Sequence, residues 1–267
     1  TGYSGSDSFS VTISDPSGAA VTGVVEMTIA IHRVFDSPTD SIVFDTGHQS
    51  YVHKLLTGRQ DFSKLREKGG IAGYPQRSES VHDIVESSHA SSSLSWADGI
   101  SRAYSMSGQS DRHVVAVVGD GALTGGMTWE ALNNISHDNS RNLIIIVNDN
   151  GRSYAPTIGG MARFLDSVRT RKGYRNLHFS SSRLFAKMGP YARAFYRGVR
   201  GGVHGFLSRF TNNQDLYANL DIKYLGPVNG HDVKAMEAVL RQAKSYGAPV
   251  IVHAITEKGK GYEPARR

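Results

Sequence analysis

Residues 114–126, VVAVVGDGALTGG, lead from an apolar run into a turn that sets one acid between two glycines. Residues 114–118 are apolar and mostly β-branched, which is typical of a buried strand. Gly119 and Gly121 permit backbone angles, or a close approach, that larger residues would resist. Asp120 is therefore expected at the carboxyl end of that strand, where open α/β sheets bind their ligands. A carboxylate beside glycine amides suits a magnesium ion that bridges to phosphate, although an ordinary polar turn fits this stretch equally well.

Apolar runs alternate with helical patterns along the rest of the chain. The predicted strands are residues 42–44, 114–118, 143–147 and 250–255, and the predicted helices are residues 93–106, 127–136 and 233–243. This alternation favours an α/β fold, with a parallel sheet covered by helices on both faces. We expect a divergent Gly/Ser-rich segment, residues 1–22, followed by one domain, residues 23–267, that contains a basic and mobile insertion at about 163–212.

Composition excludes several classes of protein. A hydrophobic content of 39% is ample for a buried core, whereas no apolar run is long enough to predict a transmembrane span. The absence of cysteine excludes disulfides, thiolate metal sites and thiol catalysis. The first residues contain no basic start followed by an apolar block, so no secretory signal is predicted and cytoplasm is the default location.

The net charge of +6 belongs to one segment of the chain. Residues 163–209 contain 11 Lys or Arg residues and a single acid, Asp166, so this segment carries +10 and the remainder carries −4. Aromatic residues interleave with these charges, and a nucleic-acid-binding module is therefore one interpretation. Because no recognised binding motif frames the charges, we favour a loop with short helices that lies beside an anionic ligand or packs on a partner.

A second group of polar residues, Asn148, Asp149 and Asn150, follows the predicted strand 143–147. Asn150 lies 30 residues after Asp120, and one predicted helix separates the two strands. A right-handed crossover would place the two strand ends side by side. A carboxylate oxygen, an amide oxygen and a backbone carbonyl are a reasonable protein share of a magnesium shell, with water and a diphosphate at the other positions.

The GDG and NDN triplets together resemble the thiamine-diphosphate-binding motif. Six blocks of sequence, in the same order, are similar to the 1-deoxy-D-xylulose-5-phosphate synthase family, a branch of the transketolase-like enzymes. The blocks are DTGHQSYVHKLLTGR (45–59), ESSHASSSLSWADGI (86–100), VVGDGALTGGMTWEALNN (117–134), VNDNGRSYAPTIGG (147–160), YLGPVNGHD (224–232) and EKGKGYEPA (257–265). The resemblance covers residues 23–265 and implies the thiamine-diphosphate-binding fold of the transketolase N-terminal part, with thiamine diphosphate and Mg²⁺ as cofactors.

The resemblance also implies roles for individual residues. The implied metal ligands are the side chains of Asp120 and Asn150 and the backbone carbonyl of Arg152. The implied cofactor-binding residues are His48, Ser88, His89, Ala90, Gly121, Ala122, Asn150 and Tyr262. His48 is the catalytic candidate as well, beside the diphosphate or the reacting oxygens. By contrast, His53 is expected to pack or cap, and His231 to mark the start of a helix at Asp232.

The chain departs from the family pattern at Ser17 and at residues 88–90. Counting back from GVVE (23–26), the family histidine near the substrate is Ser17 here, and the family block G-H-S is S-H-A at residues 88–90. A hydroxyl cannot carry a proton near neutral pH as imidazole can. If that histidine moves a proton, its loss costs about 10²–10⁴ in rate. Alternatively, the substrate has changed or the register differs there.

Full-length family members continue into a pyrimidine-binding domain and a C-terminal domain, and a second family histidine follows the GYEP block; this sequence stops at Arg267 before them. We therefore expect the diphosphate-binding half of a carboligase that joins an α-keto acid or ketose donor to an aldehyde-like acceptor. Activity would require a pyrimidine-binding domain or subunit, in a hetero- or homo-oligomer. A natural split subunit is favoured over a fragment of a longer polypeptide. The alternative is a non-catalytic, partner-binding relative, against which the intact GDG and NDN triplets count.

Overall fold

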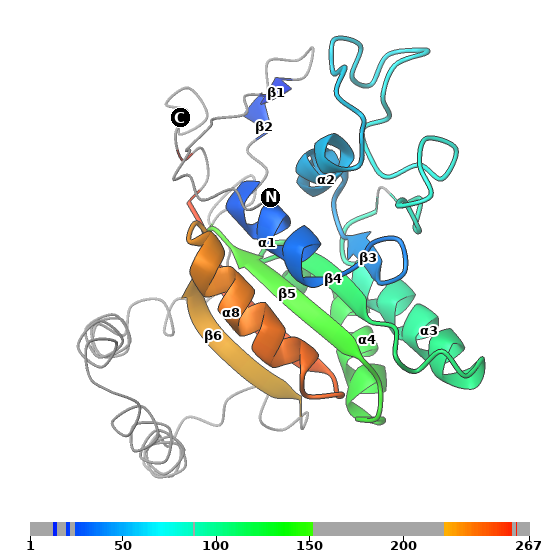
Figure 1. Ribbon diagram of the computed structural model, residues 1–267, viewed down its shortest axis with the longest axis vertical. Helices are drawn as coiled ribbons and strands as arrows, with labels where there is room; N and C mark the ends of the chain where they lie inside the picture. The colour runs from blue at the N-terminus through cyan, green and yellow to red at the C-terminus, as the bar shows by residue number, and fades with distance from the viewer. Residues whose placement is uncertain are drawn as a thin grey trace, which may run out of the picture.

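The computed structural model describes residues 13–14, 20–21, 25–87, 89–151, 222–257 and 260 (Figure 1). Its centre is a five-stranded sheet in the order β3-β4-β5-β7-β6, in which every neighbouring pair is parallel. The strands are β3 (Ser41–Phe44), β4 (Val114–Gly119), β5 (Leu143–Asp149), β6 (Lys223–Asn229) and β7 (Val250–Ile255). Two short strands, β1 (Ile13–Ser14) and β2 (Ala20–Val21), pair antiparallel in a separate sheet.

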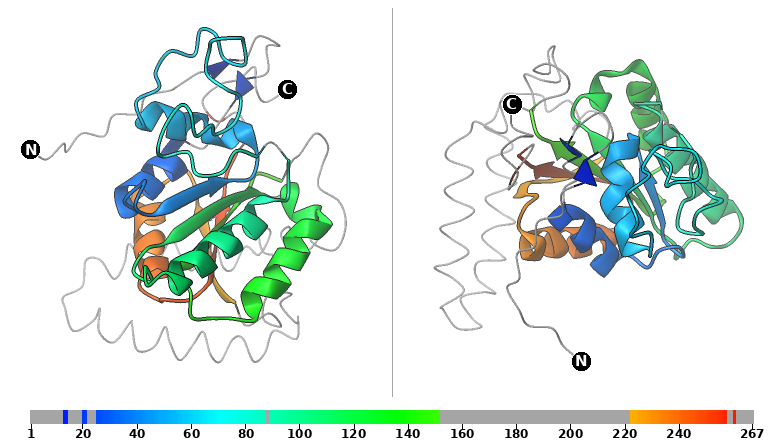
Figure 2. Two further views of the ribbon diagram at one scale, coloured as in Figure 1. Left: turned by 90° about the vertical axis from the view of Figure 1, so that its right-hand side faces the viewer. Right: turned by 90° about the horizontal axis from the view of Figure 1, so that it is seen from above.

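Helices cover both faces of the large sheet, as Figure 2 shows from two sides. The helices are α1 (Val25–Val34), α2 (Tyr51–Leu56), α3 (Ser93–Met106), α4 (Gly126–Ser136) and α8 (Val233–Lys244), with the 3₁₀ turns η1 (Gly47–Ser50) and η2 (Ala122–Thr124). Helices α1 and α8 pack together on one apolar cluster, and α3 and α4 pack on a second cluster across the sheet. The predicted α/β fold, a parallel sheet covered on both faces, is confirmed.

Some elements were not predicted from the sequence. Strand β6 carries Gly226 and Pro227 where its pairing with β7 is interrupted between Leu225 and Val228. Proline cannot donate to the ladder, so an edge strand with an irregularity is where it is tolerated. Helix α1 is rich in β-branched residues, which have modest helix propensity, and packing of its buried face against α8 stabilises it.

A buried polar cluster lies where α1 and α2 meet the loop that follows α2. His32 Nε2 is 2.9 Å from His53 Nδ1, and His53 Nε2 is 3.1 Å from Asp83 Oδ1. Arg59 also donates to Asp83 Oδ1, at 2.9 Å. His53 is 1% exposed, and its ring packs 5.1 Å from that of Phe44. The prediction that His53 packs in the fold is confirmed.

We expect this cluster to make the folded protein less stable in mild acid. Burial, followed by the charges of His53 and His82, lowers the pKa of His32 from 6.5 to about 4. Between pH 4 and pH 6.5 the unfolded chain therefore binds more protons than the folded chain does. The contribution of His32 to stability is thus full above pH 6.5 and declines as the pH falls towards 4. We expect the melting temperature to follow this course, and a His32→Gln variant to show a flatter profile between pH 4 and 6.5. Parallel profiles for the two proteins would contradict the assignment.

Several predictions fall on residues outside the described ranges. They concern the divergent segment 1–22, apart from β1 and β2, and the basic insertion at about 163–212. In the part of the chain that the structure describes, no helix combines the length and the apolar character needed to cross a membrane.

Candidate functional site

The carboxyl ends of β3, β4 and β5 meet at one edge of the sheet. Gly119 pairs with Asn148, and the backbone N–H of Asp120 donates to the Asn148 carbonyl at 3.2 Å. The backbone N–H of Asp45, just after β3, donates to the Val117 carbonyl at 2.9 Å. The expectation that the strands before the GDG and NDN turns end side by side is confirmed.

The candidate ligands lie just beyond these strand ends. Asp120 is 3% exposed, and Asn150 and Gly121 are partly buried. Ala122 begins η2, and His48 lies exposed in η1 beyond the end of β3. One carboxylate, one amide and several backbone amides therefore occupy a single edge, as the sequence predicted. Their assignment to metal and cofactor remains a prediction.

Neither glycine of the GDG turn has a positive φ. Gly121 has φ −64°, an angle that any residue adopts. A Cβ on Gly119 would lie 3.3 Å from Gln49 Nε2, so the absence of a side chain lets Gln49 pack against the turn. Gln49 was not singled out from the sequence. Its position directly after His48 is the sequence feature that could have pointed to it.

A buried carboxylate joins three segments of the site. Asp45 accepts hydrogen bonds from the backbone N–H groups of Ser91 at 2.8 Å and Ser93 at 3.0 Å. Ser91 Oγ donates to the Ala122 carbonyl at 2.7 Å, and Thr128 Oγ1 donates to the same oxygen at 3.1 Å. Sequence reasoning missed Asp45 and Ser91. An acid directly after a buried strand was the signal that could have found Asp45.

The segment before Ser91 carries His89 and Ala90, two of the predicted cofactor-binding residues. Both are exposed, and His89 Nδ1 lies 2.7 Å from the Ala90 carbonyl. The hydrogen bond from Ser91 to the Ala122 carbonyl holds the end of this segment against the GDG turn. The roles of His89 and Ala90 in binding stay predictions. Ser17, Ser88, Arg152 and Tyr262 lie outside the described residues.

His231 precedes helix α8 and makes hydrogen bonds within the fold. Asp232 Oδ1 accepts from the Ala235 N–H at 3.0 Å, which caps α8 as expected. His231 Nδ1 is 3.2 Å from Glu26 Oε2, and Nε2 accepts from the Glu257 N–H at 2.9 Å. Burial opposes ionisation of Glu26, but the hydrogen bond from His231 holds the pKa of Glu26 below its ordinary value.

The residues of this edge fit a magnesium–diphosphate group. Oxygen ligands with one negative charge suit Mg²⁺, which commonly takes one or two carboxylates and completes its shell with phosphate and water. Gln49 Oε1 is buried and has no hydrogen-bond partner among the described residues, which leaves an acceptor ready for a bound molecule. Within the same residues, no group of three or more His, Cys, Asp or Glu side chains could hold a metal. The ligand set predicted from the sequence is of a different kind, with one carboxylate, one amide and one backbone carbonyl.

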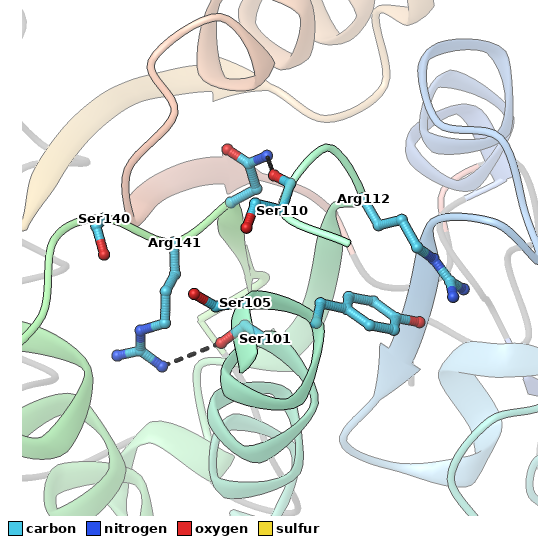
Figure 3. A pocket seen from close by; sticks show the side chains of 8 residues that line it. Ser101, Ser105, Ser110, Arg112, Ser140 and Arg141 are labelled. Atoms are coloured by element: carbon cyan, nitrogen blue, oxygen red, sulfur yellow. Dashed lines mark hydrogen bonds between the residues drawn. The ribbon is translucent and has the colours of Figure 1, made fainter. Parts of the chain in front are cut away.

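A shallow hollow at the opposite edge of the sheet does not compete with this site. Figure 3 shows its lining, which includes Arg112 and Arg141 before β4 and β5. Its volume of about 10 Å³ is at the lower limit for holding a single water molecule. Arg112 already donates to the Thr39 carbonyl, and Arg141 donates to Asp98 and Ser101. We therefore assign this hollow a structural role.

Ser91 also leaves no room for a side chain at Gly125. The φ and ψ of Gly125, −76° and 142°, suit any residue, but a Cβ would lie 2.1 Å from Ser91 Oγ. We expect Gly125→Ala to lower the free energy of unfolding by about 1–3 kcal/mol, measured by urea denaturation. Ser91 has φ +71°, which glycine adopts freely, so adding Ser91→Gly removes the clash and should restore much of the loss. A double variant no more stable than Gly125→Ala would contradict this account.

Comparison with known proteins identifies the family to which the chain is similar. The model of the family described as 1-deoxy-D-xylulose-5-phosphate synthase matches residues 11–256. The proteins named 1-deoxy-D-xylulose-5-phosphate synthase from Leifsonia xyli and Clavibacter sepedonicus are 79% and 78% identical over 245 residues. The corresponding protein from Tropheryma whipplei is 63% identical over 243 residues. These alignments cover 91–92% of this chain and 38% of each relative. The chain therefore belongs to the 1-deoxy-D-xylulose-5-phosphate synthase family and spans well under half the length of these relatives.

Proposed function

We propose that this chain is the diphosphate-binding half of a thiamine-diphosphate-dependent carboligase of the transketolase class. The observation that carries the proposal is the pairing of β4 with β5, because it sets Asp120 and Asn150 just beyond adjacent strand ends. Their side chains hold Mg²⁺, and the Arg152 carbonyl is the third protein ligand. Gly121 and Ala122 donate backbone N–H groups to the diphosphate.

Thiamine diphosphate, when bound, supplies the electron sink for breaking and forming bonds between carbon atoms. The residues of this chain bind and orient that group. His48 donates a hydrogen bond to the diphosphate or to a reacting oxygen, and Ser88, His89, Ala90 and Tyr262 border the cofactor. An α-keto acid or a ketose is the proposed donor, and an aldehyde-like molecule is the proposed acceptor.

The proposal includes a partner. A pyrimidine-binding domain or subunit completes the site, either in the same polypeptide or as a separate subunit of a hetero- or homo-oligomer. Support comes from the relatives, because this chain matches only 38% of their length. We propose that the chain alone does not turn over substrate, and turnover by the purified chain with both cofactors would contradict this. A cytoplasmic location stays a prediction.

The test is a calorimetric titration of thiamine diphosphate into the purified chain, with Mg²⁺ and, separately, with EDTA. Binding that requires Mg²⁺ is the expected result. If no binding occurs, the titration is repeated with the pyrimidine-binding region of a relative added. Failure in both forms would overturn the proposal and favour the alternative, a non-catalytic relative that retains the fold for partner binding.

A further inference from the structure

Three polar side chains from neighbouring strands form a hydrogen-bonded chain inside the sheet. Tyr224 Oη of β6 lies 2.5 Å from His253 Nδ1 of β7, and His253 Nε2 lies 2.9 Å from Asp149 Oδ2 of β5. The side chain of His253 is fully buried, and that of Asp149 is 2% exposed. An ionisable pair at the centre of an apolar sheet is costly unless it is fully bonded, so it requires an explanation.

The pattern of donors and acceptors fixes the direction of this chain. A carboxylate only accepts, so His253 Nε2 donates its proton to Asp149. In the neutral ring Nδ1 then accepts, and it is the Tyr224 hydroxyl that donates to it. Both ring nitrogens of His253 are therefore engaged, which leaves neither of them to bind a ligand directly. Any influence of His253 on a ligand acts through Asp149.

Asp149 shapes the turn that carries Asn150. Its Oδ1 accepts the Gly151 N–H at 3.0 Å, and Gly151 has φ +70°. Its backbone carbonyl accepts the Thr256 N–H at 2.8 Å, and Thr256 Oγ1 donates to Asn148 Oδ1 at 2.7 Å. The residues on both sides of Asn150 are thereby held, and the Asp149 carboxylate closes the turn.

We propose that His253, oriented by Tyr224, is a positioning residue that holds the turn bearing Asn150 through the Asp149 carboxylate and so sets the affinity for Mg²⁺. This inference rests on the proposed function, because Asn150 is the proposed metal ligand. Partners of this kind, one shell outside a metal, commonly change metal affinity by about 10–100-fold when they are lost.

Two substitutions of one side chain separate positioning from general packing. In His253→Gln the amide nitrogen can take the place of Nε2 and still donate to Asp149, whereas in His253→Asn the side chain is too short. We expect His253→Asn to raise the Mg²⁺ concentration needed for thiamine diphosphate binding by about 10–100-fold and His253→Gln to stay within about threefold of wild type. His113→Asn is the matched control, because His113 is a buried histidine beside a carboxylate at the opposite edge of the sheet.

Exchange of the Gly151 amide hydrogen, measured without ligand, gives a readout that does not depend on the cofactor. It should accelerate in His253→Asn and not in His253→Gln or His113→Asn. If His253→Asn does not fold, Tyr224→Phe is tested in its place. In this variant we expect Gly151 exchange to be faster and the required Mg²⁺ concentration to rise by up to about fivefold.

The outcomes distinguish this inference from the proposed function. Binding in His253→Asn with the Mg²⁺ requirement of the wild type overturns the inference alone, as does equal loss in the Asn and Gln variants. Absence of binding by the wild-type chain, with its partner region present, overturns the proposed function and with it the role of His253 in affinity. In that case unchanged Gly151 exchange would also overturn the positioning of the turn.

Discussion

Replacing Asp120 with alanine should abolish Mg²⁺-dependent binding of thiamine diphosphate. Asp120 is 3% exposed at the end of β4, and its backbone N–H donates to the Asn148 carbonyl. The carboxylates of Asp45 and Asp149 at the same edge accept hydrogen bonds from other groups, so neither moves easily into its place. Asp120 is the only carboxylate in the proposed ligand set. Removing it leaves neutral oxygen ligands for a divalent cation, and we expect affinity in calorimetry to fall by more than about 100-fold, or about 2.7 kcal/mol.

Two further variants make this expectation specific. Asp120→Asn keeps the shape and removes the charge, so its affinity should fall nearly as far as that of the alanine variant. Asp111→Ala makes the same change at an exposed acid before β4, at the opposite end of that strand, and should bind as the wild type does. Retention of Mg²⁺-dependent binding by Asp120→Ala would remove Asp120 from the ligand set. Melting temperatures without ligand verify that each variant is folded.

The sequence predicted the elements whose signals are local. Residues 114–118 and 143–147 are apolar, β-branched runs, and both are strands because the hydrophobic effect buries them on both faces of the sheet. The juxtaposition of the GDG and NDN turns could also be predicted, since a short crossover helix makes sequential strands neighbours. Strand β6 was missed because glycine and proline interrupt its pattern at an edge.

The supporting residues of the site could not be predicted from the sequence in the same way. Asp45 and Ser91 are 46 residues apart, and only the folded chain brings the carboxylate to the backbone N–H of Ser91. Likewise, Asp149 and His253 meet because β7 inserts beside β5 after a long excursion of the chain. A histidine within the buried strand VIVHAI was a visible anomaly, but its partner depended on strand order, which sequence patterning did not provide.

Replacing Asp45 with alanine should produce the largest loss of stability among these variants. Its side chain is fully buried and accepts two backbone N–H groups, those of Ser91 and Ser93 at the start of α3. Truncation leaves both donors without this acceptor inside the protein, and each costs about 1–3 kcal/mol when unsatisfied. We expect the free energy of unfolding in urea to fall by about 3 kcal/mol. Loosening of Ser91 also removes one of the side-chain hydrogen bonds to the Ala122 carbonyl, so thiamine diphosphate binding should weaken in parallel.

Matched substitutions identify the cause of that loss. Asp45→Asn keeps one acceptor oxygen but turns an NH₂ group towards the second N–H donor, so its stability should lie between those of the wild type and Asp45→Ala. Asp61→Ala removes a carboxylate that also accepts a backbone N–H, from Ser63 at 3.0 Å, but Asp61 is exposed to solvent. Because water replaces that contact, the loss of stability should be much smaller than the loss in Asp45→Ala. Equal losses for Asp45→Ala and Asp61→Ala would show that burial of the Asp45 contacts does not hold this part of the site together.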